Sequence, residues 1–262
     1  MRRKQPLGQN FLCDQNVASQ IIELAHISPN DPVVEIGPGK GVLTSDLLKR
    51  SKSLTALEVD PRLCADLTRR FGSHSGFRLL QADASKFDYS SLGPKFKVVS
   101  NLPYYIGTPI LKRLIHYGSR IIDMTLMLQK ELVDRLVAEP GQKEYGSLTV
   151  FVQYQCTVER LLEVKQTCFS PPPKVDSSVI RVTPLPRPRV MVHSEKTFFK
   201  VTNAAFFHKR KMLKNNLKEW RDQFHVEQNK VLLAGIDLTR RGETLSLEDF
   251  ATIANAVQPA ND

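Results

Sequence analysis

Long apolar segments are absent from this 262-residue chain, and their absence argues against a membrane-spanning protein. No apolar run approaches the roughly 20 residues that a helix needs to cross a bilayer. Met1–Lys4 is basic, but it is not followed by the apolar stretch that a secretory signal carries. Internal repeats and low-complexity segments are missing as well. We therefore expect a cytoplasmic globular protein that has no membrane partner.

Cysteines are few and far apart. The chain has four of them, and none has CxxC spacing: Cys13, Cys64, Cys156 and Cys168. Such spacing resembles neither a zinc site nor a disulfide framework. We expect reduced thiols that pack as small apolar groups, and no bound metal ion.

Positive charge is in excess and is unevenly distributed. Lys and Arg number 37 and Asp and Glu 27, which gives a formal net charge of +10. Residues 187–221 alone hold ten basic side chains and two acidic ones. A local field of this size favours a polyanion, because binding releases counterions. The candidate contacts for such a polyanion are Arg187, Arg189, Lys209, Arg210, Lys211 and Lys214. The alternative interpretation of such a charge run is a solvated helix face.

The first 185 residues alternate short β-rich runs with helical patterns. Five runs are predicted as strands: Pro32–Ile36, Leu54–Val59, Phe77–Gln81, Phe96–Ser100 and Met124–Leu128. Helical patterns cover Val42–Arg50 and Leu63–Phe71. Strands separated by helices at this spacing predict an α/β fold with a parallel sheet and right-handed crossovers.

The end of the chain has a different pattern. Val158–Val164 and Val179–Val182 are expected as a last pair of strands with no helix between them. Pro184–Pro188 then interrupts regular structure, and the pattern beyond it is helical to about Val257, with Ser246 as a helix N-cap. The sequence thus predicts an α/β domain over residues 1–185 and a small, basic, all-α domain over residues 186–262.

Glycines and acidic residues at the predicted strand ends indicate a cofactor site. Gly37 and Gly39 lie where the first strand ends and a helix opens, so that a ligand can lie against bare main chain. Val42 stands where a dinucleotide-binding turn has its third glycine, which argues against NAD. Glu58 ends the second strand, where a carboxylate can accept hydrogen bonds from both ribose hydroxyls of an adenosine cofactor. Asp83 follows the third strand, as a contact for the adenine amino group or as a helix cap.

The segment Asn101-Leu102-Pro103-Tyr104 follows the fourth strand, at the edge of the sheet where open α/β folds bind ligands. The amino nitrogen of adenine is a poor nucleophile, because its lone pair is delocalised into the ring. The Asn101 side-chain oxygen and the Pro103 carbonyl could each accept one N–H and aim that lone pair at a methyl group. Tyr104 could stack on the base, which contributes roughly 1–3 kcal/mol. By itself such a segment is most often a plain turn. Together with its position at a strand end and the glycine turn upstream, it predicts methyl transfer to adenine.

Five segments together resemble the KsgA family of ribosomal RNA adenine dimethyltransferases, and the likeness runs from about Leu7 to Asn255. They are Leu7–Leu12, Glu35–Gly39, Asn101–Tyr104, Phe169–Ser177 and Leu245–Phe250. The third and fourth are specific to adenine-N6 methylation of RNA within the superfamily. The resemblance implies a Rossmann-like, S-adenosylmethionine-dependent methyltransferase domain followed by a small all-α domain.

The resemblance also assigns roles to residues. It implies that the methyl donor contacts Asn10, Leu12, Gly37, Gly39, Glu58, Asp83 and Asn101. It implies that Asn101, Pro103, Tyr104 and Phe169 hold the target base, although Phe169 by itself is interpreted as a core aromatic beside a proline turn. The implied substrate is a pair of adjacent adenosines in a hairpin loop near the 3′ end of 16S rRNA. Each of the two receives two methyl groups while the small ribosomal subunit matures, and we expect a monomeric enzyme.

One departure and three alternatives accompany this interpretation. Tyr105-Ile106-Gly107-Thr108 stands where bacterial members usually have Asn-Ile-Ser-Thr, which bears on rate more than on reaction type. The first alternative is a large-subunit rRNA adenine methylase of the antibiotic-resistance type, against which Leu102 and Leu245–Phe250 argue. The second is a mainly non-catalytic ribosome-assembly factor. The third, a nicotinamide dehydrogenase, shares only the glycine turn and Glu58.

Overall fold

The computed structural model describes residues 10–219 and 234–257, so Leu7–Gln9 of the N-terminal motif lies outside the described residues. The chain divides into two compact units. The first contains the described residues up to Val133 together with Thr157–Pro184. The second contains Asp134–Cys156 and the described residues from Leu185 onward.

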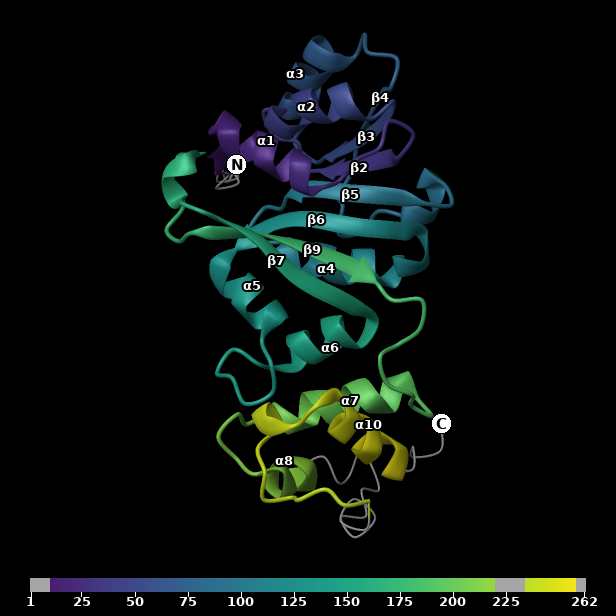
Figure 1. The fold of residues 1–262 in the computed structure, drawn as a ribbon, viewed down its shortest axis with the longest axis vertical. Coiled ribbons are helices and arrows are strands. Elements are labelled where there is room, and N and C mark those ends of the chain that lie inside the picture. The colour runs from purple at the N-terminus through teal and green to yellow at the C-terminus, as the bar shows by residue number, and fades with distance from the viewer. Residues whose placement is uncertain (1–9, 220–233, 258–262) are drawn as a thin grey trace, which may run out of the picture. The chain divides into compact units, whose positions relative to one another are not determined.

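A seven-stranded mixed sheet forms the centre of the first unit, in the order β4-β3-β2-β5-β6-β9-β7 (Figure 1). Five of its strands are parallel: β2 (Pro32–Ile36), β3 (Ser53–Glu58), β4 (Phe77–Gln81), β5 (Phe96–Asn101) and β6 (Ile121–Gln129). The last two are β9 (Ser177–Pro184), antiparallel to β6, and β7 (Cys156–Val164). The predicted α/β fold is confirmed, and residues 165–176, between the last two strands of the sheet, contain no α-helix, as expected.

Helices and short turns connect the strands. The helices are α1 (Gln15–Leu24), α2 (Val42–Arg50), α3 (Pro61–Phe71), α4 (Gly107–His116), α5 (Lys130–Val137) and α6 (Ser147–Gln155). Single 3-10 turns cover Tyr89–Leu92, Gly118–Arg120 and Gln166–Cys168. Asp14 and Asp60 cap α1 and α3 by accepting backbone N–H groups of the first turn. The core of this unit joins α1, α2 and the strands through Ile21, Leu47 and Val99.

A separate two-stranded sheet pairs β1 (Phe11–Leu12) with β8 (Phe169–Ser170). The strands are antiparallel, with Leu12 opposite Phe169 and Phe11 opposite Ser170. The Cys13 amide extends the pairing by donating to the Cys168 carbonyl. This small sheet therefore holds together two segments that are about 155 residues apart in the chain.

The second unit is helical. Its helices after the linker are α7 (Glu195–Ala205), α8 (Leu213–Glu219) and α10 (Leu247–Ala256), with a 3-10 turn at Gly242–Thr244. Ser246 caps α10 as expected, by accepting from the Asp249 amide while the Asp249 carboxylate accepts from the Ser246 amide.

The sequence assigned residues 134–156 to the first domain. In the structure they belong to the second unit. Tyr145, Val150 and Tyr154 are buried in one cluster with Phe198 and Phe250. The rings of Tyr154 and Phe198 are stacked, with centroids 4.7 Å apart. Because this helical segment completes the apolar core of the second unit, it clusters there and not with the strands that flank it in the chain.

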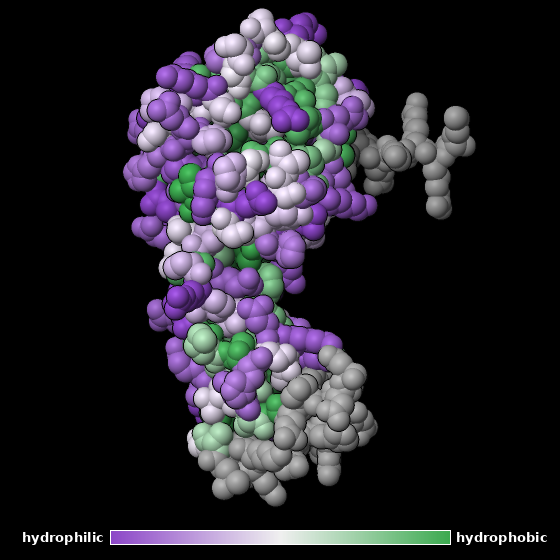
Figure 2. Space-filling view, turned by 90° about the vertical axis from the view of Figure 1, so that its right-hand side faces the viewer, coloured by the Kyte–Doolittle hydropathy of each residue, from purple (hydrophilic) through white to green (hydrophobic). Residues whose placement is uncertain are grey.

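The surface face in Figure 2 is mostly hydrophilic, with apolar groups separated by polar and charged side chains. Within residues 10–219 and 234–257, no helix has both the length and the apolar character needed to cross a membrane.

Candidate active site

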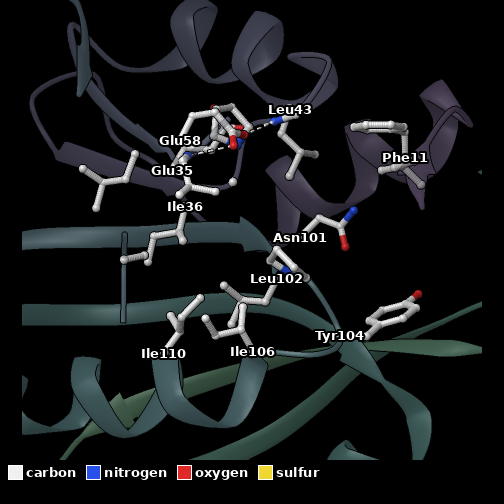
Figure 3. A pocket seen from close by; sticks show the side chains of 18 of the residues that line it. Phe11, Glu35, Ile36, Leu43, Glu58, Asn101, Leu102, Tyr104, Ile106 and Ile110 are labelled. Carbon is white, nitrogen blue, oxygen red and sulfur yellow. Dashed lines mark hydrogen bonds between the residues drawn. The ribbon is translucent and has the colours of Figure 1, made fainter. Parts of the chain in front are cut away.

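A pocket of about 320 Å³ opens at the carboxyl ends of β2, β3 and β5 (Figure 3). This volume falls within the range of small-molecule sites in proteins. Every residue that the sequence assigned to the cofactor lines it: Asn10, Leu12, Gly37, Gly39, Glu58, Asp83 and Asn101. The parallel register explains their convergence, since the carboxyl ends of neighbouring strands meet at one edge of the sheet.

The glycine turn after β2 presents bare backbone to this pocket. Gly37 and Gly39 have φ of +64° and +56°, in the left-handed region that disfavours residues with a Cβ. A Cβ on Gly39 would lie 3.1 Å from ring atoms of Phe11, closer than a normal contact. The Gly37 amide donates to the Leu57 carbonyl at 2.8 Å, which fixes the turn against β3. The turn therefore needs glycine for both its conformation and its close packing.

Glu58, the last residue of β3, is 3% exposed and rigidly held. One carboxylate oxygen accepts from the amides of Val59 and Asp60, at 2.8 and 2.9 Å. The other accepts from the Gly39 amide at 3.2 Å, which ties the carboxylate to the glycine turn. A carboxylate offers about four acceptor positions, so acceptor capacity remains for a ligand hydroxyl.

Asp83 both caps a turn and lines the pocket, so the two interpretations of this residue are compatible. Its carboxylate accepts from the hydroxyl and the amide of Ser85, at 2.6 and 2.9 Å. These hydrogen bonds hold the pKa of Asp83 below its ordinary value.

Glu35 lies in β2, lines the pocket and is buried. Thr44 donates its hydroxyl to the carboxyl group at 2.7 Å. Burial, with a smaller contribution from the negative charge of Glu58, raises the pKa of Glu35 to about 8, although the Thr44 hydrogen bond opposes this rise. Glu35 is therefore a neutral acid at neutral pH.

This shift predicts that the contribution of Glu35 to stability falls as pH rises. Between about pH 4.5 and pH 8 the folded state retains a proton that the unfolded state releases, so unfolding becomes more favourable as pH increases. Glu35→Gln removes this proton and keeps an acceptor for Thr44. We expect its unfolding free energy to rise relative to the wild type by up to about 1.4 kcal/mol per pH unit across that window. Denaturant unfolding at a series of pH values measures the difference.

The exposed Glu159→Gln variant is the control, and its stability should vary with pH as that of the wild type does. If the stability of Glu35→Gln also varied with pH in parallel with the wild type, the raised pKa of Glu35 would be contradicted.

The loop after β5 is anchored at its start. Asn101 ends the strand opposite Met127, and the Leu102 amide donates to the Met127 carbonyl at 3.1 Å. Leu102 is buried, which holds the loop against the sheet. Figure 3 shows the Asn101 carboxamide projecting from the strand end, on the side of the pocket where Phe11 and Tyr104 lie. Among the described residues this carboxamide has no hydrogen-bond partner, so it is available to a ligand.

Pro103 and Tyr104 also line the pocket. The Pro103 carbonyl accepts from the Ile106 amide at 3.1 Å and retains a second lone pair. The Tyr104 hydroxyl lies 2.5 Å from the Ser177 hydroxyl oxygen. Burial raises the pKa of Tyr104, so its phenol is neutral over the whole physiological range.

Phe169 is placed differently from the other three candidate base contacts. It is 3% exposed, belongs to the core cluster that contains Leu12, and does not line the pocket. Its ring presents an edge to Tyr104, with centroids 6.5 Å apart and an interplanar angle of 63°. The structure thus brings Asn101, Pro103 and Tyr104 together in the pocket with Phe169 next to them. Stacking of Phe169 on a base stays a prediction.

Comparison with known proteins identifies the family of this site. The family model described as ribosomal RNA adenine dimethylase matches residues 1–259. The chain belongs to this family. It is 45% identical to ribosomal RNA small subunit methyltransferase A of Clostridium botulinum, over 96% of this chain and 92% of the relative. It is 43% identical to the protein of the same name from Saccharophagus degradans, over 98% and 96%.

Solved structures agree with the family assignment. A dimethyladenosine transferase from Plasmodium falciparum is similar with a TM-score of 0.77 and 26% identity, over 93% of this chain and 95% of that one. The 23S rRNA methyltransferase ErmE is similar with a TM-score of 0.73 and 25% identity, over 95% and 99%. The dimethylase fold therefore extends over both units, and the nicotinamide dehydrogenase alternative is removed.

Several pocket residues of this dimethylase were not predicted from the sequence. Phe11 lies under the glycine turn, and the Lys40 ammonium group lies 4.8 Å from the centre of its ring. Tyr105 lines the pocket and is 57% exposed. Burial raises its pKa, and the negative charges of Glu58 and Asp83 raise it further. Phe11 belongs to the family segment Leu7–Leu12, and Tyr105 follows Asn101–Tyr104 directly, but neither was assigned a role in the site from the sequence.

The six basic residues proposed to contact RNA are all exposed and all belong to the second unit of the dimethylase: Arg187, Arg189, Lys209, Arg210, Lys211 and Lys214. Lys209–Lys211 lie between α7 and α8, where Lys209 donates to the Lys143 carbonyl. Exposure is what a polyanion contact requires, and their role in binding RNA stays a prediction.

Proposed function

We propose that this chain transfers methyl groups from S-adenosylmethionine to the N6 amino groups of two adjacent adenosines, in a hairpin loop near the 3′ end of small-subunit (16S) rRNA. The observation that carries the proposal is the Asn101 carboxamide at the end of β5, which pairs with no described residue and lies in the same pocket as Glu58, Asp83 and Tyr104. The names of the relatives that are 43–45% identical favour the small subunit.

The pocket residues fit the donor. The turn at Gly37 and Gly39 lets a ligand approach the backbone closely, Glu58 would accept from ribose hydroxyls, and Asp83 would accept from the adenine amino group. Leu57 and Val59, the chain neighbours of Glu58, add apolar side chains to the pocket lining. When bound, S-adenosylmethionine supplies a methyl group made electrophilic by the adjoining positively charged sulfur.

The loop residues act on the target adenine. The Asn101 oxygen and the Pro103 carbonyl each accept one N–H of the exocyclic amine, which turns the nitrogen lone pair out of conjugation and aims it. Tyr104 supports the face of the base, which must leave its own stack to reach the pocket. As the amine becomes positively charged on methylation, the two oxygens stabilise it, and the extra proton then passes to water. The chain therefore needs no general base before transfer.

The second unit supplies RNA affinity in this proposal. Its exposed cations neutralise phosphates of the small ribosomal subunit, the protein acts as a monomer in the cytoplasm, and the first unit carries the chemistry.

Reversing the charge of Lys209, Arg210 and Lys211 to Glu should weaken binding to rRNA and flatten its salt dependence. The slope of log K against log salt is negative, and each lost phosphate contact reduces its magnitude by about 0.7–0.9. Binding to small-subunit rRNA at several salt concentrations gives the slope. A matched control reverses Lys49, Arg50 and Lys52, which are exposed cations of the first unit. An unchanged slope for the Lys209–Lys211 variant would remove this segment from the interface.

The function is tested by incubating the protein with labelled donor and either unmethylated small subunits or large subunits, and then digesting the rRNA to nucleosides. We expect label only in small-subunit rRNA, as N6,N6-dimethyladenosine at two adjacent positions. Label confined to the large subunit would establish the resistance-type alternative, which the likeness to ErmE motivates. No label in either subunit would favour a non-catalytic assembly factor.

A further inference from the structure

Ser177 is a buried polar residue next to the proposed base site, and the proposed reaction gives it no role. It is the first residue of β9 and lies opposite Gln129, at the end of β6. Its side chain is 0% exposed, and its hydroxyl oxygen lies 2.5 Å from the Tyr104 hydroxyl oxygen. It belongs to the Phe169–Ser177 segment, but it does not line the cofactor pocket.

Tyr104 depends on this contact for its orientation. It lies in a loop between β5 and α4, where no backbone ladder fixes the ring. Its ring touches Phe169 edge-on, and Ser177 is the hydrogen-bond partner recorded for its hydroxyl. Ser177 is rigid by comparison, because it is buried at the start of a strand that pairs with β6 along its length. A hydrogen bond at the far end of the ring therefore restrains the direction of the ring plane.

We infer that Ser177 is a positioning residue for the methyl acceptor: it holds the Tyr104 ring in the orientation that supports the target adenine. The inference rests on the proposed function only for the identity of the base. Because Ser177 does not contact the pocket, the inference requires its effect to appear on the RNA side of the reaction and not on donor binding.

The adjacent residue provides a matched control. Ser178 is also 0% exposed and lies opposite Leu128 in the same pair of strands. Its hydroxyl group has no hydrogen-bond partner in the part of the chain that the structure describes. Neighbouring residues of a strand point to opposite faces, so Ser178 faces away from Tyr104. Ser177→Ala and Ser178→Ala therefore remove the same atom at the same depth, and only the first removes a contact with Tyr104.

Kinetics with small-subunit rRNA give the first test. We expect Ser177→Ala to lower kcat/KM for the RNA about tenfold while the Kd of the donor changes less than twofold. Ser178→Ala should change either constant less than twofold. Tyr104→Phe removes the same hydrogen bond without altering a buried strand, so it should match Ser177→Ala, and the double variant should fall no further. Equal effects of the two serine variants, or additive effects in the double variant, would overturn the inference.

A second readout does not depend on methylation. With 3-fluorotyrosine at position 104, the ¹⁹F resonance should shift in Ser177→Ala and stay in place in Ser178→Ala. An unchanged resonance in Ser177→Ala would overturn the inference, even if the wild type methylates rRNA as proposed. If the resonance shifts in Ser177→Ala but the wild type methylates no rRNA, the hydrogen bond would still be shown to orient Tyr104, and the proposed function would be overturned.

Discussion

Replacing Asn101 with alanine should reduce methyl transfer to small-subunit rRNA by a factor on the order of 10²–10³. The variant removes one of the two oxygens proposed to hold the adenine amino group, and the Pro103 carbonyl cannot replace it because the two acceptors serve different N–H groups. Donor affinity should fall less than tenfold, since the other six cofactor residues remain in the pocket. Single-turnover transfer and isothermal titration with the donor measure the two effects separately.

Asn203, an exposed asparagine of α7, provides the control for this substitution. Asn203→Ala should transfer methyl groups at the wild-type rate. Unaltered dimethylation by Asn101→Ala would exclude the side-chain oxygen from the reaction, and an equal loss of transfer and donor binding would make Asn101 a cofactor contact only.

The second large effect concerns donor binding at Glu58. Glu58→Gln keeps the shape of the side chain but places an NH₂ group against the amides of Gly39, Val59 or Asp60, which now donate to a carboxylate. Hydrogen bonds to a charged group contribute about 1.5–3 kcal/mol, so we expect the donor to bind roughly 10- to 100-fold more weakly. Titration calorimetry with S-adenosylmethionine measures the affinity.

Glu144→Gln is the matched control for Glu58→Gln, because Glu144 is exposed and lies outside the pocket. Its donor affinity should equal that of the wild type. A folded Glu58→Gln protein that binds the donor normally would contradict the role given to this carboxylate.

Much of this architecture is encoded locally and could be predicted. The strand Pro32–Ile36 and the helix Val42–Arg50 were predicted at their observed bounds, because a short run rich in β-branched residues and an amphipathic stripe differ in period. The convergence of Gly37, Glu58 and Asn101 followed from one topological rule, that the carboxyl ends of parallel strands share an edge.

Contacts between distant segments could not be predicted. The pairing of Leu12 with Phe169 joins residues more than 150 positions apart, and two-residue strands have no periodicity to detect. Tyr154 packs on Phe198 because of tertiary position, which its own sequence pattern does not specify. The partner of Ser177 was equally hidden, since a serine at the start of a strand has many possible partners until the fold brings Tyr104 to it.

The most direct test of the account is a structure of the protein with a donor analogue and a target adenosine in the pocket. We predict that the Asn101 side-chain oxygen lies about 3 Å from the adenine N6 nitrogen, with the Pro103 carbonyl oxygen at a similar distance and the nitrogen facing the donor's methyl position. An adenosine bound with Asn101 turned away from N6, or with another atom of the base facing that position, would contradict it.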